Sequence, residues 1–495
     1  MQEPAGDELA RLLRRRDWRA ADNHDIIRGL LGYSFKMNRL KVPLSTRATS
    51  WIFATTMLAA AAVPALAQAP APPRPAPPAA ATAQPGAPVA GNPVLAPEAV
   101  QTPPPVVAPP LPPPPVVWDP ASAQDLVHYI GQVGADGLNP GDYDPEGLEA
   151  AIQSGNPLAM SQAATERFNQ LSSDLALGHV KRSARIAWFM VDPDLDAAKQ
   201  DALLRNALAT HRIADSLNGL LPTHPQYAAL KAALEMTPAT QSSNIERIRL
   251  NMDRWRWLPR ELGPKYIIVN VPGFHATLVE NGVNRWKQRA IAGATKTPTP
   301  QLSATAVGVM LNPSWEVPPS ITHEVVGKKG FVPVKKDGKI IRWSQPPGPT
   351  NALGQVKFVM YNPQNIYLHD TNARSRFDSR MRALSHGCVR TQHILDLATE
   401  LLGDDGGEWT PDKIEAQLAT GKSKQANFVK PVPVYIVYFS AAALNDGRIV
   451  DYKDLYARDA HDLAALEAKD GGAAMAAAKA KAKADAKAAA QVASK

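Results

Sequence analysis

Cys388 is the only cysteine among the 495 residues of the chain, and two histidines, His369 and His386, precede it. A single cysteine cannot form an intramolecular disulfide, and alone it makes a poor metal site. It is therefore either a small core residue or a nucleophile. The two histidines favour the nucleophile, because an imidazole can take the thiol proton and the thiolate is the reactive form.

A cysteine that transfers acyl groups needs a general base and a group that orients this base. We assign His369 as the base, since it ends a predicted strand, 365–368, from which a side chain can face a neighbouring strand end. His386 is the rival base. Alternation would place it on the same face as Cys388 with parallel side chains and Cα atoms about 6.6 Å apart, so we favour a supporting or substrate-contact role. Asp370 could orient the imidazole through its carboxylate or backbone carbonyl, or else form a turn.

Acyl transfer also needs donors that stabilise an oxyanion. Gly387 lets the backbone approach a substrate closely, and the N–H groups of Gly387 and Cys388 are candidate donors. Tyr367 is a side-chain candidate for the same task. Arg390 lies two residues after the cysteine, on the same face if the strand persists, and would anchor a carboxylate or form a structural salt bridge. No metal or organic cofactor is implied, since the thiol and the imidazoles suffice.

The other histidines carry no such pattern. We interpret them as surface or packing residues, among them His179, His224, His275 and His323.

The amino-terminal region has the order of a signal peptide over residues 37–67. Basic residues precede an apolar run, 51–63, that is too short for a comfortable membrane span, and a small-residue cleavage site follows at 65–67. We therefore predict export to the periplasm of a Gram-negative type of envelope, with an uncleaved membrane anchor as the alternative. The charged residues 1–36 are either a cytoplasmic extension or a misassigned start, with translation beginning at Met37.

Two further segments are compositionally biased. Pro and Ala dominate residues 68–117, which we interpret as a disordered linker. Residues 466–495 form an Ala/Lys-rich tail that lacks an apolar stripe, so we predict a solvated, frayed tail rather than a helix. Its lysines supply much of the formal net charge of +8. This charge is compatible with weak attraction to anionic envelope polymers, whereas the sequence has no nucleic-acid motif, zinc spacing or phosphate loop.

Between these segments the hydrophobic period changes once. Apolar residues recur at helical spacing from 118 to about 237, so we predict an all-helical domain over 118–243. From Lys265 onward strands and turns alternate, so we predict a mostly β domain over 244–465, with one helix over 393–402. The fold class is therefore α+β. The expected strands are 266–271, 275–279, 286–292, 306–311, 354–360, 366–368 and 433–439.

The segments Tyr367-Leu-His-Asp-Thr371 and Arg382-Ala-Leu-Ser-His-Gly-Cys-Val-Arg390 together resemble the signature of the L,D-transpeptidase family, with its YkuD-like catalytic domain. Other segments resemble the larger periplasmic subgroup of this family, which carries a helical scaffold domain. The resemblance covers roughly residues 118–459. The supporting segments are 251–259, 311–318 and 346–354 in the catalytic part and 136–140 and 222–227 in the scaffold.

The resemblance implies a peptidoglycan enzyme. Its cysteine attacks the bond between an L-centre diamino acid and a D-residue in a stem peptide, and the resulting thioester passes to an amine of a neighbouring stem. Carbapenems acylate family members. The resemblance also implies a lid over about 315–344. By the motif match, Cys388 is the nucleophile and His369 the base, and His386, Gly387 and Arg390 fall on motif positions. Together with the residue arguments above, we assign Cys388, His369, Asp370 and Gly387 to catalysis. We assign substrate contacts to Tyr367, His386, Arg390, Trp315 and Ser385.

Two departures from the family pattern are visible. Arg390 stands where many members have Asn, although Arg is common in the subgroup. The subgroup often inserts a helical peptidoglycan-binding module, whereas only residues 236–244 occupy that place here.

Three functions remain open at this point. The first is the transpeptidase, with 3–3 crosslinks, 1–3 crosslinks or attachment to a protein lysine as outcomes. The second is a hydrolase, an L,D-carboxypeptidase or endopeptidase that uses the same residues with water as the acceptor. The third is a non-enzymatic scaffold that binds the envelope.

Overall fold

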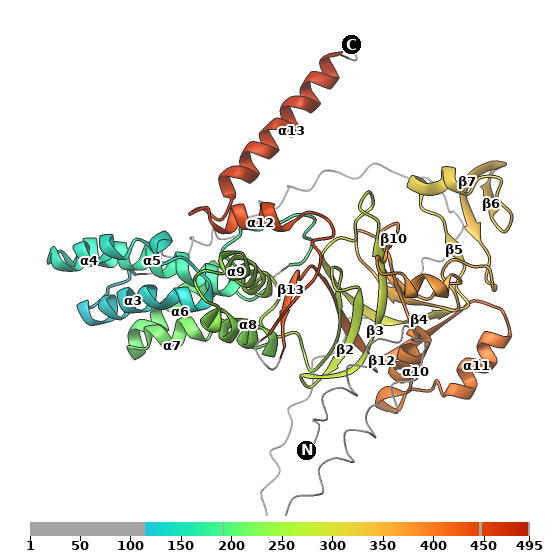
Figure 1. The fold of residues 1–495 in the computed structure, drawn as a ribbon, viewed down its shortest axis with the longest axis horizontal. Coiled ribbons are helices and arrows are strands. Elements are labelled where there is room, and N and C mark those ends of the chain that lie inside the picture. Colours follow the sequence, from blue (N-terminus) through green and yellow to red (C-terminus); the bar gives the residue numbers. More distant parts are fainter. Residues whose placement is uncertain (1–113, 192, 445–447, 494–495) are drawn as a thin grey trace, which may run out of the picture. The chain divides into compact units, whose positions relative to one another are not determined.

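The computed structural model describes residues 114–191, 193–444 and 448–493. The predicted extension 1–36, the signal peptide 37–67 and nearly all of the linker 68–117 lie outside the described residues. The predicted α+β class is confirmed, because helices precede a mostly β part along the chain (Figure 1). Within the described ranges, no helix is both long enough and apolar enough to cross a membrane.

The helical part begins where an N-cap residue precedes a proline. Asp119 and Asn156 each accept a hydrogen bond from a backbone N–H of the first helical turn, and a proline opens the helix, which is the favoured arrangement at a helix start. Asp144 does the same. The helices are α3 (Pro120–Gln132), α4 (Pro145–Gln153), α5 (Pro157–Leu177), α6 (Ala197–Thr210), α7 (Ile213–Asn218), α8 (Pro225–Met236) and α9 (Ser242–Arg256), with short 3-10 turns η1 (Val133–Asp136) and η2 (Pro140–Tyr143).

Helix α9 joins the helical part to the β part through buried charged groups. Arg254 is 2% exposed and forms ion pairs with Asp459 and Asp462, each at 2.8 Å. The Asn251 side chain both donates to the Ser440 hydroxyl and accepts from the Ser440 N–H. Buried charges are tolerated only when they are paired, so these contacts fix how α9 meets the carboxy-terminal segments.

The main sheet has nine strands in the order β10-β3-β11-β9-β8-β4-β12-β1-β2. Strand β3 also pairs with β2, so the strands from β3 to β2 close on themselves. The helix α10 (Ile394–Gly403) contacts β8 and β12 (Figure 1). The strands are β1 (Lys265–Asn270), β2 (His275–Glu280), β3 (Val283–Gly293), β4 (Leu302–Leu311), β8 (Val356–Met360), β9 (Leu368–His369), β10 (Ala383–Ser385), β11 (Val389–Thr391) and β12 (Lys424–Val437).

The core of this sheet is built from alternate residues of its strands. Ile267, Phe358, Leu368 and Val389 are each 0% exposed, and Leu397 of α10 packs with them. Since side chains alternate between the two faces of a strand, the neighbours of Leu368 and Val389 in sequence point away from this core. Those neighbours include the residues singled out for chemistry.

The predicted lid is a small folded unit. It contains a second sheet in the order β5-β7-β6 (Figure 1) and its own apolar cluster of Val317, Ile321 and Val325, against which Trp315, Phe331 and Trp343 pack. The expected lid is therefore an ordered hairpin with a short helix. Its elements are β5 (Trp315–Glu316), η3 (Pro319–Glu324), β6 (Val332–Lys336) and β7 (Lys339–Gln345).

Several element predictions differ from the structure. Besides the one expected helix over 393–402, the β part also contains helices α11 (Pro411–Ala419) and α12 (Asp459–Leu466). The last strand of the sheet, expected at 433–439, is β12, and it begins at Lys424. Its pairing with β4 shifts between Asn427 and Val432, where Lys430 and Pro431 interrupt the alternating pattern that marks a strand. The remaining elements are η4 (Arg374–Asp378), η5 (Asp404–Gly406), α11 (Pro411–Ala419), β13 (Ala441–Ala443), β14 (Ile449–Asp451) and α12 (Asp459–Leu466).

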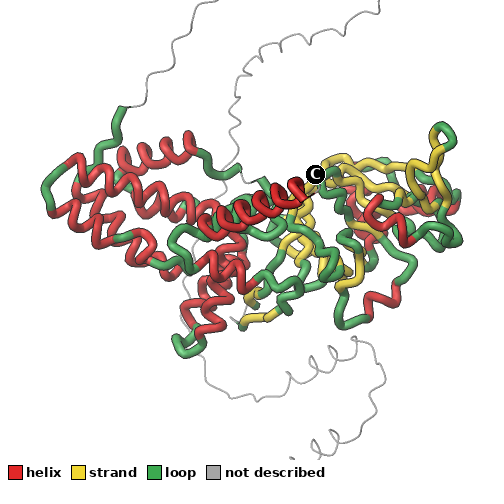
Figure 2. Tube along the Cα trace, turned by 90° about the horizontal axis from the view of Figure 1, so that it is seen from above, coloured by secondary structure: helices red, strands yellow, loops and turns green. Residues whose placement is uncertain are grey.

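The predicted frayed tail is instead a helix. Residues Ala473–Ala493 form α13, which Figure 2 shows as a continuous helix near the carboxy terminus. The high helix propensity of alanine outweighs the missing apolar stripe. The segment before α13 is anchored, because the Gly471 carbonyl accepts from the Lys181 N–H at 2.9 Å.

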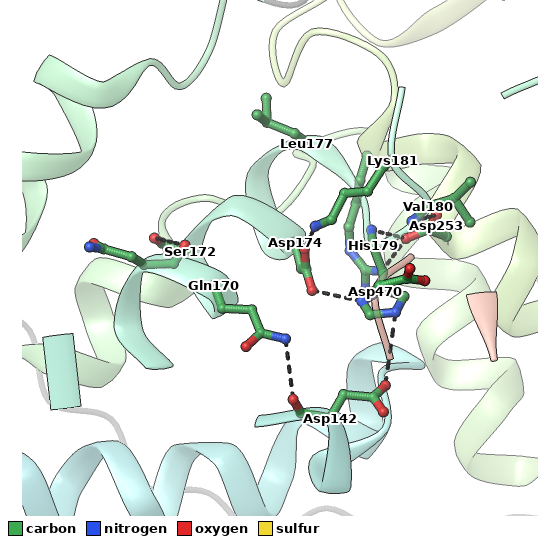
Figure 3. Close-up of polar contacts among 12 residues, drawn as sticks. Asp142, Gln170, Ser172, Asp174, Leu177, His179, Val180, Lys181, Asp253 and Asp470 are labelled. Atoms are coloured by element: carbon green, nitrogen blue, oxygen red, sulfur yellow. Dashed lines mark hydrogen bonds and ion pairs between the residues drawn. The ribbon is translucent and has the colours of Figure 1, made fainter. Parts of the chain in front are cut away.

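His179 lies at the centre of a buried polar cluster beside this anchor (Figure 3). Its Nδ1 lies 2.7 Å from Asp174 Oδ2 and its Nε2 lies 2.9 Å from the Ala468 carbonyl. Asp142 is 3.9 Å from Nε2, and the His179 N–H donates to Asp253. Burial alone would lower the pKa of His179, but Asp174, aided by Asp253, raises it to about 9. The imidazolium form is favoured because both ring nitrogens face acceptors.

This cluster predicts a stability difference that depends on pH. The pKa of His179 is raised in the folded protein, so its stabilising effect is complete below the ordinary pKa of about 6.5 and is lost as pH rises through about 9. We expect His179→Asn to unfold at a lower urea concentration than wild type at pH 6. The difference in free energy of unfolding between wild type and variant should be smaller at pH 9.5 than at pH 6, by up to about 3 kcal/mol.

Urea unfolding followed by tryptophan fluorescence at both pH values measures this gap. The exposed His323 provides a matched control, since His323→Asn should give the same small gap at both pH values. A gap for His179→Asn that is equal at pH 6 and pH 9.5 would contradict the assignment.

Candidate active site

Strands β9 and β11 bring the predicted catalytic residues together. They pair in parallel, with Leu368 opposite Val389 and His369 opposite Arg390. Leu368 and Val389 point into the core. Alternation therefore directs four side chains to the other face of the two strands, where they form a two-by-two array. These four are Tyr367 and His369 from one strand and Cys388 and Arg390 from the other.

The thiol of Cys388 is surrounded by hydrogen-bonding groups. Both the backbone N–H and the hydroxyl of Tyr367 donate toward its sulfur, and Sγ lies 3.7 Å from the Asn365 carbonyl. Burial raises the pKa of the Cys388 thiol above its usual range. The two Tyr367 donors oppose that rise, and the cations of Lys357 and Arg390 do so more weakly.

His369 is buried and neutral. Burial lowers the pKa of His369 to about 3, and the cations of Arg390 and Lys357 add to the lowering. Its Nδ1 has no hydrogen-bond partner among the described residues. The raised pKa of Cys388 and the lowered pKa of His369 both favour the uncharged form of the group, a thiol and a neutral imidazole.

Asp370 does not direct its carboxylate at His369. Its side chain lies on the opposite side of the strand, where Oδ2 accepts from the Gln355 N–H at 3.0 Å and from Arg374 at 3.1 Å. Of the two predicted routes for orienting the imidazole, only the Asp370 backbone lies near His369, where it partly opposes the lowering of the His369 pKa. The Asp370 carboxylate instead links the end of β9 to Gln355, just before β8, and to Arg374 of η4.

The turn before Cys388 is held from inside. Ser385 is 3% exposed, and its hydroxyl donates to the Cys388 carbonyl at 2.5 Å and accepts from the Gly387 N–H at 3.2 Å. Gly387 has φ of +118°, a conformation that favours glycine, and its carbonyl accepts from the Thr299 hydroxyl at 2.7 Å.

The hydrogen bonds of this turn change the sets of candidate oxyanion donors and substrate contacts. The Gly387 N–H is committed to Ser385, which leaves the Cys388 N–H and Tyr367 as the predicted oxyanion donors. The placement of Ser385 gives no support to a substrate contact by its side chain.

The lid touches the site at two points. Trp315 donates a hydrogen bond toward the Tyr367 hydroxyl. His386 is exposed, and its Nε2 lies 3.2 Å from Glu324 Oε1 of η3. His386 therefore faces the lid rather than the sulfur. This geometry favours the predicted supporting role over the rival role as the base.

Sequence reasoning missed Lys357. It lies opposite His369 in the pairing of β8 with β9, and its Nζ is 4.7 Å from the centre of the Tyr367 ring. A lysine within the apolar strand Val356–Met360 is the signal that could have identified it, because such a strand places a cation on the face opposite the core. Across the described ranges, no group of three or more His, Cys, Asp or Glu residues could hold a metal ion.

Comparison with known proteins identifies two domains. Residues 264–434 match the YkuD family, described as the L,D-transpeptidase catalytic domain, and residues 115–234 match the scaffold domain family. A curated relative from Haemophilus influenzae, named "Putative L,D-transpeptidase", is 29% identical over 283 residues. The match covers 51% of this chain, and the chain spans 57% of the length of that relative.

Solved structures of the same family are also similar. The L,D-transpeptidase from Mycobacterium smegmatis is 14% identical, with 35% of this chain and 58% of that chain covered and a TM-score of 0.19. The catalytic domain of the E. faecium L,D-transpeptidase acylated by ertapenem is 13% identical. That similarity covers 36% of this chain and 98% of the other, with a TM-score of 0.19.

The hydrogen bond from Tyr367 predicts the reactivity of the thiol. Tyr367→Phe keeps the ring and the backbone N–H but removes the hydroxyl that stabilises the thiolate, so the pKa of Cys388 should rise further. We expect alkylation by iodoacetamide at pH 8 to slow by roughly 10- to 100-fold, the usual effect of one hydrogen bond to a charged group. Intact-mass measurements of alkylation rate from pH 6.5 to 10.5 give the midpoint.

Tyr361 is 80% exposed and provides the control, because Tyr361→Phe should leave the alkylation profile unchanged. If the midpoint of Tyr367→Phe stays at the wild-type value or falls, the hydroxyl does not stabilise the thiolate.

Proposed function

Because the chain contains an L,D-transpeptidase catalytic domain at residues 264–434 and a scaffold domain at residues 115–234, we propose that it crosslinks the stem peptides of peptidoglycan through a thioester on Cys388. The observation that carries this proposal is the shared face of Tyr367, His369, Cys388 and Arg390 on the paired strands β9 and β11. This face holds a nucleophile, a base and an oxyanion donor within one small array.

The first half-reaction forms the thioester. His369 takes the proton of the thiol, and Sγ of Cys388 attacks the carbonyl carbon of the L-centre diamino acid. The Cys388 N–H and the Tyr367 hydroxyl stabilise the oxyanion. The C–N bond to the D-residue then breaks, and the leaving amine takes the proton from His369.

The second half-reaction transfers the acyl group. An amine of a neighbouring stem attacks the thioester carbonyl and loses its proton to His369. The C–S bond breaks, and the sulfur leaves as a thiolate that recovers this proton. The acceptor decides whether a 3–3 or a 1–3 crosslink forms, and water in its place would give the hydrolase.

Proton transfer from Cys388 to His369 requires groups that stabilise the resulting thiolate and imidazolium. A neutral thiol and a neutral imidazole in a buried site do not exchange a proton readily, because burial disfavours both charged forms. The lid already contacts Tyr367 through Trp315 in this structure, so the substrate supplies the further polar groups that the ionised pair requires. We propose that the lid determines whether an amine or water is the acceptor, because it controls whether water reaches the thioester.

The substrate also sets where the protein works. Peptidoglycan lies in the cell envelope, so the catalytic domain acts in the periplasm, in agreement with the signal peptide expected at 37–67. Carbapenems should acylate the same thiol, as they are expected to do in this family.

A Cys388→Ala variant tests the reaction. Wild type incubated with a disaccharide-tetrapeptide should release a D-amino acid and form dimeric muropeptides, and the variant should lose this activity by about 10⁴-fold or more, because a nucleophile cannot be replaced by its neighbours. Liquid chromatography with mass spectrometry identifies the products, and their fragmentation separates 3–3 from 1–3 linkage. Circular dichroism checks that the variant folds.

Each other outcome has a distinct meaning. Tripeptides without dimers would replace the transpeptidase with the hydrolase. Dimers formed equally well by Cys388→Ala would contradict the cysteine mechanism. If wild type gives neither product and no carbapenem adduct, the silent envelope-binding scaffold becomes the better account.

A further inference from the structure

Two basic residues flank His369 across three neighbouring strands at the nucleophile. Lys357 of β8 pairs with His369 of β9, and His369 pairs with Arg390 of β11. Residues directly opposite one another on paired strands point to the same face. Two cations therefore flank the buried imidazole, on the face that also carries Cys388.

A contact with Tyr367 places Lys357 at the site, and Arg390 acts on the same thiol through its charge. The Lys357 Nζ lies 4.7 Å from the centre of the ring of Tyr367, whose hydroxyl bonds to Cys388. Both Lys357 and Arg390 act on the charge of the Cys388 thiolate. Each is partly buried.

These cations lack an anionic partner. Among the described residues, neither Lys357 nor Arg390 forms an ion pair, and Arg390 Nε is buried without a hydrogen-bond partner. The acid that influences Lys357 is Glu316 of the lid, and its carboxylate lies 3.1 Å from Arg342. Burial lowers the pKa of both Lys357 and Arg390. Partly buried cations without a counter-charge are costly, which favours an external anion.

We propose that Lys357 and Arg390 form a carboxylate-binding site at the nucleophile, and that this site binds a carboxylate of the donor stem next to the scissile bond. The inference rests on the proposed function for the identity of the donor, and it adds the group that the enzyme recognises and the residue, Lys357, that recognises it. A guanidinium can grip a carboxylate with two parallel N–H groups, whereas an ammonium acts as a point charge. The two side chains together set both the angle and the depth of the bound group.

Two carboxylates of a donor stem belong to the residues on either side of the scissile bond. One is the terminal carboxylate of the D-residue that leaves, and the other is the distal carboxylate of the diamino acid. Both have the same chemistry, so the experiment separates them. Either one would also neutralise the cations that lower the pKa of His369, and it would make the imidazole a better base once the substrate is bound.

Binding to Cys388→Ala tests the site without requiring catalysis. Three tetrapeptide donors are compared by isothermal titration calorimetry: the free acid, the donor with a terminal amide, and the donor with an amide on the diamino acid. We expect one of the two amides to bind roughly 10- to 100-fold more weakly than the free acid, the usual effect of losing a hydrogen bond between charged groups. The weaker amide identifies the carboxylate that is bound.

The double variant with Lys357→Met should reduce this preference for the acid to about 3-fold or less, and Lys357→Arg should retain most of it. Lys287 is an exposed lysine of β3, so Lys287→Met is the matched control and should keep the full preference. Circular dichroism checks that each variant folds, and Lys357→Arg guards against a loss that reflects packing alone.

Several results would overturn the inference. These are equal binding of all three donors, a preference that survives Lys357→Met, or no measurable binding of any donor. Failure of the proposed function gives a different pattern, in which Cys388→Ala prefers the free acid but wild type forms neither a thioester nor a released D-amino acid.

Discussion

The parallel pairing of β9 with β11 is the constraint on which the site depends. The Val389 N–H donates to the Tyr367 carbonyl at 3.0 Å, and Leu368 and Val389 are both fully buried. A shift of either strand by one residue would exchange its two faces, so Cys388 would enter the core. Both strands are short, and their register is therefore held by the packing of Leu368 and Val389 more than by the length of the ladder.

Groups around this pairing fix the position of Cys388 and His369, and the lid contacts residues next to them. Ser385 and Thr299 fix the turn that leads to Cys388, and the carboxylate of Asp370 ties the end of β9 to the chain before β8. The lid contacts both Tyr367 and His386. The Cys388–His369 pair of such a site stays uncharged until a substrate completes its polar surroundings, because a buried ion pair is stable only with its full set of partners.

The sequence identifies the reactive residues better than it identifies their partners. The spacing of Cys388 and Arg390 predicts a shared face, and the end of a strand predicts the place of His369. Alternation would also have shown that Asp370 points away from the imidazole. The closeness of Lys357 depends on the pairing of β8 with β9, which no local pattern records.

The secondary structure was also predicted only in part from the sequence. Helical and strand periods predicted the two parts of the chain and their order. The start of β12 was missed, because Lys430 and Pro431 interrupt its pattern, and the helix α13 was missed, because alanine propensity outweighed the absence of an apolar stripe. The buried polar cluster around His179 could not be recognised from its neighbours in sequence alone, since Asp253 and the Ala468 carbonyl lie far along the chain from it.

The most direct test of the account is the isolation of the covalent intermediate. Wild-type protein is mixed with a tetrapeptide donor that has no free acceptor amine, the reaction is stopped with acid, and intact mass and peptide mapping locate the adduct. The account predicts a mass increase equal to the donor minus its D-residue, on the peptide that contains Cys388, with one D-amino acid released for each adduct. Release of the D-amino acid without an adduct on that peptide, or with an adduct on another residue, would contradict it.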